Sequence, residues 1–110
     1  MSEEKPLELT AANFDKTIKG DIPVLVDFWA PWCGPCQIML PIVGELTVSY
    51  KGKVVIASVN IDENPEIAGK FNVMSVPTLL CFKDGKVVNQ LVGVTPKDEL
   101  EKVLNKLIGA

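Results

Sequence analysis

The 110-residue sequence contains no histidine and only three cysteines. A structural zinc site needs about four cysteine or histidine ligands, so a single copy of the chain cannot build one. Only a dimer that shares two cysteine pairs could complete such a site, and we expect no metal. An odd number of cysteines also fits poorly with the disulfide framework of a small secreted protein.

The chain also lacks an excess of positive charge and a long apolar run. Its 11 basic and 14 acidic residues give a net charge of −3, unlike the basic surface of a nucleic-acid-binding protein. No apolar stretch approaches the length that spans a bilayer, and residues 1–6 are acidic, unlike a secretory signal. We therefore expect a soluble, cytoplasmic protein in a reducing compartment, with neither nucleic acid nor a membrane as its partner.

The sequence does contain enough apolar residues for a core. Its length and its 47% hydrophobic residues predict a single domain over residues 1–110 that buries roughly two-thirds of its unfolded surface. Such a core does not need a disulfide cross-link for its stability. A disulfide that closes a short loop would add only about 2 kcal/mol to the free energy of unfolding. A pair of neighbouring cysteines is therefore more consistent with redox chemistry than with a structural role.

Two cysteines lie close together at the end of an apolar strand. Residues 24–29 are nearly all apolar, as in a strand covered on both faces, and a helical pattern follows Cys33-Gly34-Pro35-Cys36. The first turn of a helix has unpaired N–H groups and the positive end of the helix dipole, which stabilise a thiolate. We therefore predict that Cys33 is the nucleophile. Cys36, about one turn further along and less exposed, lies close enough to form a disulfide with it.

Asp27 is the polar exception in this strand. One interpretation is a buried carboxyl beneath the cysteines, whose pKa desolvation raises and which moves a proton to or from Cys36. The alternative is a half-exposed edge strand in which Asp27 faces water. Leu25 and Trp29 would then share the exposed face, which disfavours this alternative.

The remaining pattern predicts an α/β fold with a mixed sheet and helices on both faces. Strands are expected at residues 6–9, 24–29, 54–60, 78–82 and 86–92. Helices are expected at residues 11–19 after a cap at Thr10, from Cys33 to Tyr50 through Pro41, from Pro65 after a cap at Asn64, and from Pro96 after a cap at Thr95. The first of these helices is expected to bury Ala11, Phe14 and Ile18. The dipeptide Asp84-Gly85 between two apolar runs predicts a hairpin.

The sequence alone does not determine the role of Cys81 or the conformation of the peptide bond before Pro77. Cys81 lies inside an apolar run, where a free cysteine is commonly buried, so we predict a core residue. Pro77 precedes a strand, and a proline at such a position is ordinarily trans, with the cis form at about 5–6% of such bonds. The residues themselves leave the conformation of the Val76–Pro77 bond open.

The segment Trp32-Cys33-Gly34-Pro35-Cys36, after an apolar strand that carries Asp27, resembles the active site of the thioredoxin family. Val76-Pro77-Thr78 and Gly93 match further landmarks of that family, and the resemblance covers nearly the whole chain. It implies a thioredoxin fold, in which four helices flank a central mixed five-stranded sheet. The first three strands would take the order 1-3-2, and the hairpin would complete the sheet. The resemblance also implies that the Val76–Pro77 bond is cis and lies beside the cysteine pair.

The same resemblance implies a function in thiol–disulfide exchange. Cys33 and Cys36 would form the redox-active disulfide of a protein-disulfide reductase, a monomer that binds no cofactor and is recycled by a flavin-containing thioredoxin reductase. Asp27 would move a proton to or from Cys36. Protein substrates with accessible disulfides would dock on an apolar surface made of Trp32, Gly34, Pro35, Val76, Pro77, Val92 and Gly93, which Ile61 and Ser75 extend.

Two positions depart from the family pattern. Ser58 stands where many bacterial thioredoxins place a lysine near the buried acid, so we expect Asp27 to be harder to ionise. Gln37 follows Cys36 at a position where relatives often carry a cation. The thiolate therefore loses one group that would stabilise it.

Two other functions remain open at this stage. An oxidase or isomerase would use the same chemistry, although Gly34-Pro35 resembles the reducing members of the family. A scaffold could use the same apolar surface without turnover, because a fold does not determine a function.

Overall fold

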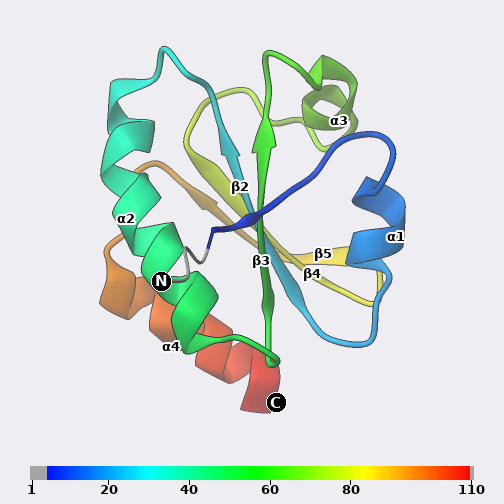
Figure 1. Cartoon of the computed structure of the whole chain (residues 1–110), viewed down its shortest axis with the longest axis vertical. Coiled ribbons are helices and arrows are strands. Elements are labelled where there is room, and N and C mark those ends of the chain that lie inside the picture. The colour runs from blue at the N-terminus through cyan, green and yellow to red at the C-terminus, as the bar shows by residue number, and fades with distance from the viewer. Residues whose placement is uncertain (1–4, 110) are drawn as a thin grey trace.

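This computed structural model describes residues 5–109 of the chain. These residues contain five strands and four helices, joined by loops (Figure 1). The strands are β1 (Leu7–Glu8), β2 (Val24–Trp29), β3 (Val55–Asn60), β4 (Thr78–Lys83) and β5 (Lys86–Val92). The helices are α1 (Phe14–Ile18), α2 (Gly34–Ser49), α3 (Pro65–Lys70) and α4 (Lys97–Gly109). Within residues 5–109, no helix has the length and apolar character needed to cross a membrane.

The strands form one mixed sheet in the order β1-β3-β2-β4-β5. β1, β3 and β2 are parallel, whereas β4 runs antiparallel to both β2 and β5. The strand order and the four helices confirm the predicted fold. Because β2 and β3 are parallel, the loops that follow Trp29 and Asn60 meet at the same edge of the sheet.

Helices cover both faces of the sheet, with α1 and α3 on one face and α2 and α4 on the other (Figure 1). The residues of β2 alternate between the two cores, since Val26 and Phe28 pack with the first pair of helices and Leu25 packs with the second. This alternation places Asp27 on the side of α2 and α4. The helical residues buried against the sheet include Phe14, Ile18 and Ile67 on one face and Met39, Val43, Leu46, Leu100 and Leu104 on the other.

The predicted hairpin joins β4 and β5. Asp84 and Gly85 both have positive φ, at 55° and 79°, as a two-residue type I′ turn requires. The β4 side of the hairpin is buried next to β2, whereas nearly all of β5 is exposed at the edge of the sheet. Cys81 of β4 is fully buried, which confirms its prediction as a core residue.

The first helix begins later than predicted. α1 starts at Phe14, and Ala11, expected on its buried face, is exposed. Asn13 supplies the reason, because its Oδ1 accepts the N–H of Thr10 at 2.8 Å and its Nδ2 donates to the carbonyl of Glu8 at 3.2 Å. An asparagine that binds nearby backbone groups in this way competes with the helix, so the chain forms a turn there first.

The side-chain cap predicted at Asn64 was also wrong. α3 begins at Pro65 as expected, but the amide of Asn64 donates to the carbonyl of Asn60 at 3.1 Å and makes no capping hydrogen bond. At α4, which begins at Lys97, the hydroxyl of Thr95 donates to the carbonyl of Gly93 at 3.2 Å. In both places a side chain of a type that commonly caps a helix donates instead to a backbone carbonyl that precedes it in the chain.

Candidate active site at the cysteine pair

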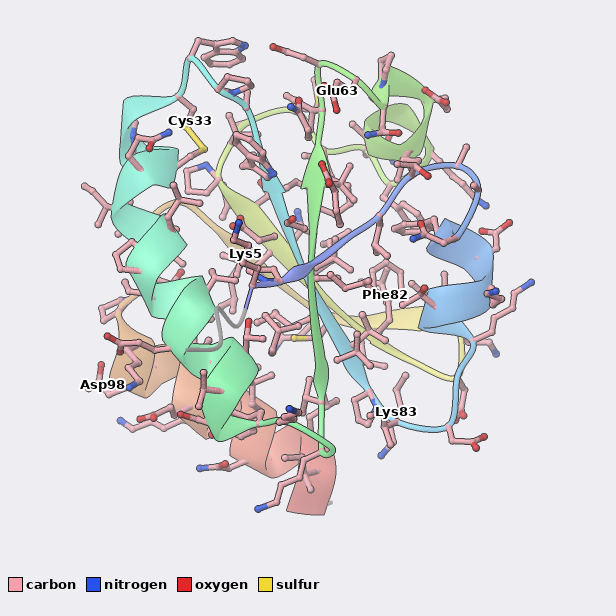
Figure 2. The ribbon with its side chains drawn as sticks, in the orientation of Figure 1. Lys5, Cys33, Glu63, Phe82, Lys83 and Asp98 are labelled. Atoms are coloured by element: carbon pink, nitrogen blue, oxygen red, sulfur yellow. A yellow bond between two sulfur atoms is a disulfide. The ribbon has the colours of Figure 1, made fainter. Side chains whose placement is uncertain are left out.

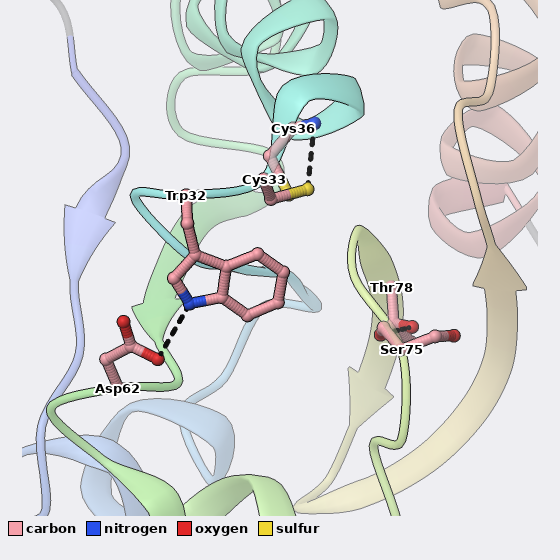
Figure 3. The surroundings of a disulfide bond; sticks show 6 residues. All are labelled: Trp32, Cys33, Cys36, Asp62, Ser75 and Thr78. Atoms are coloured by element: carbon pink, nitrogen blue, oxygen red, sulfur yellow. Dashed lines mark hydrogen bonds between the residues drawn. A yellow bond between two sulfur atoms is a disulfide. The ribbon is translucent and has the colours of Figure 1, made fainter.

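The cysteine pair lies at the start of α2, directly after the turn that follows β2. Cys33 occupies the N-cap position and Cys36 the first turn, and a disulfide joins them with their Cα atoms 5.3 Å apart. The Sγ of Cys33 accepts the backbone N–H of Cys36 at 3.1 Å, as Figure 3 shows. A backbone N–H at the helix N-terminus therefore points at the sulfur that the sequence analysis predicts to be the nucleophile. Cys33 is 4% exposed and Cys36 is 1% exposed.

Residues from three loops pack around the disulfide. Ala30 and the two cysteines form a small buried cluster, against which Trp29, Ile61 and Val76 pack. The Val76–Pro77 bond is cis. The cis bond and the contact of Val76 with the cysteine cluster confirm what the resemblance implied for this segment.

Trp32 is held beside the cysteines by a residue that the sequence analysis missed. Its indole Nε1 donates to the Oδ1 of Asp62 at 3.2 Å (Figure 3). Asp62 is itself positioned by Asn60, whose side-chain oxygen accepts the N–H of Asp62 at 2.9 Å. One signal was available in the sequence, because Asp62 follows the parallel strand β3, whose carboxyl end had to lie beside that of β2.

The surface around the disulfide is apolar and exposed. Trp32 is 68% exposed and Val92 is 62% exposed, and Gly34 and Pro35 are also exposed. The sequence analysis missed Met74, which is 93% exposed in the loop before the cis bond. Exposed apolar side chains that gather at one end of a protein are typical of a protein-binding surface.

The two landmarks of the later part of the chain lie together. The N–H of Gly93 donates to the carbonyl of Pro77 at 2.8 Å, and Gly93 has a φ of 92°, a conformation that favours glycine. Pro77 is buried. On the other side of the cis bond, the hydroxyl of Thr78 donates to the carbonyl of Ser75 at 2.7 Å (Figure 3).

Asp27 is buried in the central strand. It is 2% exposed, between Ser58 of β3 and Leu79 of β4. The alternative of a half-exposed edge strand was therefore wrong. Burial raises the pKa of Asp27 to about 7, and its Oδ1 has no hydrogen-bond partner among residues 5–109.

A cavity of about 390 Å³ opens beside this carboxyl group. Neither cysteine lines it, although Trp29 connects it to the cysteine cluster. Its walls come from the N-terminal segment, the sheet and α2. The lining residues are Lys5, Pro6, Glu8, Asp27, Trp29, Leu40, Val43, Gly44 and Ser58.

The third cysteine lies apart from this site. Cys81 is reduced and buried between β2 and β5, and burial raises the pKa of its thiol to about 11. Within the part of the chain that the structure describes, no group of three or more cysteine, aspartate or glutamate side chains is placed to hold a metal ion.

Comparisons with known proteins agree with this geometry. A family model described as Thioredoxin matches residues 5–106. The thioredoxin of Alicyclobacillus acidocaldarius subsp. acidocaldarius is 52% identical over 98 residues, which cover 89% of this chain and 93% of that protein. The thioredoxin of Chlorobaculum thiosulfatiphilum is 48% identical over 106 residues, which cover 96% of this chain and 98% of that protein.

A solved structure extends the likeness to the fold. A mutant thioredoxin from Halobacterium salinarum NRC-1 superposes with a TM-score of 0.87 at 33% sequence identity, and the match covers 98% of this chain and 95% of that chain. The strand order, the disulfide at the start of α2 and the similarity to these proteins lead to one conclusion. The chain belongs to the thioredoxin family of thiol–disulfide oxidoreductases.

Proposed function

We propose that this protein is a cytoplasmic, monomeric protein-disulfide reductase of one domain, whose Cys33–Cys36 dithiol reduces disulfides in other proteins. A flavin-containing thioredoxin reductase would return the pair to the dithiol state, and the chain itself would bind no cofactor. The position of Cys33 at the N-cap of α2, beside an exposed apolar surface, is the observation that carries the proposal.

Cys33 makes the first attack. Its thiolate attacks one sulfur of the substrate disulfide, forms a new S–S bond with that sulfur, and releases the other substrate sulfur as a thiolate. The thiolate is favoured at this position because the N–H of Cys36 donates to it and because the helix dipole is positive there. The released thiolate takes a proton from water.

Cys36 completes the reaction. Its thiol gives a proton to the carboxylate of Asp27, directly or through water, and the resulting thiolate attacks the Sγ of Cys33. The Cys33–Cys36 disulfide forms as the bond from Cys33 to the substrate breaks, so the substrate leaves with both electrons. Asp27 suits this role because a pKa of about 7 lets its carboxyl group both accept and release a proton near neutral pH.

The apolar surface would bind the substrate next to Cys33. Trp32, Gly34, Pro35 and Val92 are exposed there, and we propose that the backbone of Val76 pairs with an extended segment of the substrate. Pro77, Gly93, Ile61 and Ser75 would complete the surface. The absence of a side chain at Gly93, where an added Cβ would meet no neighbouring atom, leaves room for the backbone of a partner.

Two single variants test the proposal. Cys36→Ser should accumulate a covalent mixed disulfide with a protein substrate, because the second attack is lost, whereas Cys33→Ser should form none and should not turn over. Cys81→Ala is the matched control and should retain full turnover, because the third cysteine lies outside the site. A Cys33→Ser variant that still reduces substrate would contradict the proposed nucleophile. A doubly substituted protein that retains its cellular activity would indicate a scaffold instead.

A further inference from the structure

A second cavity, of about 580 Å³, lies between β5 and α4 and takes no part in the proposed reaction. We call it the β5–α4 groove. Its apolar lining consists of Val88 of β5 and of Val103 and Leu107 of α4, which also pack against the core on this face of the sheet. Its charged lining consists of Lys83, Glu99, Lys102 and Lys106. The groove therefore joins an apolar surface to an excess of positive charge.

A β-bulge accounts for the place of Val88 in this lining. Phe82 pairs with Val87 and Cys81 pairs with Asn89, so Val88 is an extra residue in β5. Neighbouring residues of a regular strand point to opposite faces, yet Val88 and Asn89 both line the groove. The bulge thus turns an exposed apolar side chain toward α4.

The two flanks of α4 differ in how their charges are paired. On the flank toward α2, Lys97 forms an ion pair with Glu45 at 2.9 Å. On the groove flank, Lys102 and Lys106 lie one helical turn apart, and neither has an ion-pair partner among residues 5–109. The chain as a whole has a net charge of −3, so this local excess of positive charge is not a property of the whole surface.

The groove lies away from the cysteines. β4 begins at Thr78, directly after the cis bond, and ends at Lys83, about 17 Å further along at the usual rise of a strand. Figure 2 shows Cys33 near the top of the molecule and Lys83 near its lower end. No residue of the cysteine cluster or of the proposed docking surface lines the groove. A partner bound there would leave Cys33 free to react.

We propose that the β5–α4 groove binds an acidic, amphipathic peptide segment of a partner protein. Apolar side chains of the segment would cover the apolar lining of the groove. Lys83 already donates to the carbonyl of Leu107 at 3.5 Å, so the carboxylates of the segment would pair with Lys102 and Lys106. Such a partner would hold the protein in place during turnover, and its binding does not depend on the redox state of the cysteines.

Charge complementarity favours this occupant over three others. A nucleic acid or an anionic membrane presents an extended array of negative charge, which a chain of net charge −3 repels outside the groove. A second copy of the chain would bring the same surface to a symmetric interface, so its lysines would gather with those of the first copy. A short acidic segment matches the groove without either cost.

A short peptide that alternates aspartate with leucine is the probe. We expect it to bind the full-length, oxidised protein with a dissociation constant of about 1 mM or tighter at low salt, and more weakly in about 0.5 M salt. In NMR spectra it should shift the backbone amide signals of Val88, Lys102 and Lys106. Absence of binding would overturn the proposal. So would equal binding of an analogue with lysine in place of aspartate, or shifts confined to Trp32 and Val76.

Two pairs of lysine substitutions separate the charge of the groove from the net charge of the protein. Lys102→Gln combined with Lys106→Gln should weaken peptide binding roughly 3- to 10-fold. Lys16→Gln combined with Lys70→Gln removes the same charge from α1 and α3, which cover the other face of the sheet, and should leave binding unchanged (Figure 1). Equal losses in the two double variants would contradict a site in the groove.

A valine pair tests the apolar contact. Val88→Ser should weaken peptide binding roughly 2- to 5-fold, because it removes apolar surface from the lining. Val48→Ser on α2 is the matched control, since Val88 is 50% exposed and Val48 is 58% exposed. The control should bind the peptide as the wild-type protein does. Equal effects at both valines would contradict the proposed contact.

The other occupants are tested with the same protein. We expect vesicles of anionic phospholipid and a single-stranded oligonucleotide to bind more weakly than the peptide, and sedimentation to show a monomer. Tighter binding of the vesicles or the oligonucleotide, lost in the Lys102→Gln and Lys106→Gln double variant, would overturn the peptide as the occupant. A dimer that the peptide dissociates would assign the groove to a second copy of the chain instead.

Discussion

The indole of Trp32 and the carboxylate of Asp62 join the loops that follow β2 and β3, through a hydrogen bond of 3.2 Å between Nε1 and Oδ1. Trp32 is otherwise largely exposed, and this hydrogen bond ties its indole nitrogen to the loop that follows β3. The ring is part of the proposed docking surface. The hydrogen bond therefore links Asp62, in the loop after β3, to the surface that we propose binds substrates.

Removing this acceptor should weaken substrate binding and leave the fold intact. We expect Asp62→Ala to raise the KM for a protein substrate roughly 2- to 10-fold, the value of one hydrogen bond, and to change the free energy of unfolding by no more than about 0.5 kcal/mol. Asp62→Asn keeps an acceptor oxygen and should retain most of the affinity. Steady-state kinetics and denaturant unfolding measure the two effects. An unchanged KM in Asp62→Ala would show that the ring needs no such anchor.

Asp27 should make the stability of the protein depend on pH. Its folded pKa of about 7 lies above the ordinary value of 3.8, so the folded protein binds the proton more tightly than the unfolded chain. The protonated form contributes its full stability below about pH 4, and this contribution is lost as the pH rises to about 7. The shift corresponds to about 4 kcal/mol.

Denaturant unfolding of Asp27→Asn checks this dependence. The variant should lose less stability than the wild-type protein between about pH 4 and pH 8, and it should be the more stable of the two at the upper end of this range. Parallel curves for both proteins over this range would mean that Asp27 does not carry the raised pKa.

Ser58 should be the position from which a charge acts most directly on Asp27. The two residues are register partners in adjacent strands, so an ammonium group at position 58 lies close to the carboxyl group. We expect Ser58→Lys to lower the pKa of Asp27 by about 1 unit or more. Ser58→Met, with a side chain of similar length and no charge, is the control. The carboxyl carbon chemical shift of Asp27 across pH measures both, and equal values in the two variants would exclude a charge effect.

Cys81 should be chemically silent in the folded protein. It is fully buried, and burial raises the pKa of its thiol to about 11, so little thiolate forms near neutral pH. We expect a thiol-specific reagent to find no reactive group in the folded, oxidised protein and one group after unfolding. Cys81→Ser should cost about 1–3 kcal/mol, because it places a hydroxyl group in an apolar core. Rapid labelling of the folded protein would contradict this burial.

The features that the sequence predicted well are those with a local cause. The apolar run of β2, the turn at Asp84 and Gly85, and the placement of Cys33 before a helical pattern each follow from residues that are neighbours in the chain. The burial of Asp27 was predictable for the same reason, since Leu25 and Trp29 on its face disfavoured an exposed strand.

Two of the missed features depend on short-range hydrogen bonds that compete with a helix cap, and a third depends on contacts between segments far apart in the chain. The side chain of Asn13 donates to the carbonyl of Glu8, which delays α1, and the side chain of Asn64 donates to the carbonyl of Asn60 at the end of β3 and does not cap its own helix. Propensity alone cannot rank these loop contacts against a cap. Lys5, Glu8 and Gly44 line one cavity beside Asp27, and no periodicity in the chain indicates that these segments come together.

An equilibrium redox titration of the Cys33–Cys36 pair against a defined thiol buffer, followed by tryptophan fluorescence, tests the proposed function most directly. Trp29 packs against the cysteine cluster and Trp32 precedes Cys33, so the emission should report the state of the disulfide. We expect a potential well below that of the cytosolic glutathione pool, which lets the dithiol reduce other proteins. A potential near those of oxidising or isomerising enzymes, or a pair that does not titrate, would contradict a reductase.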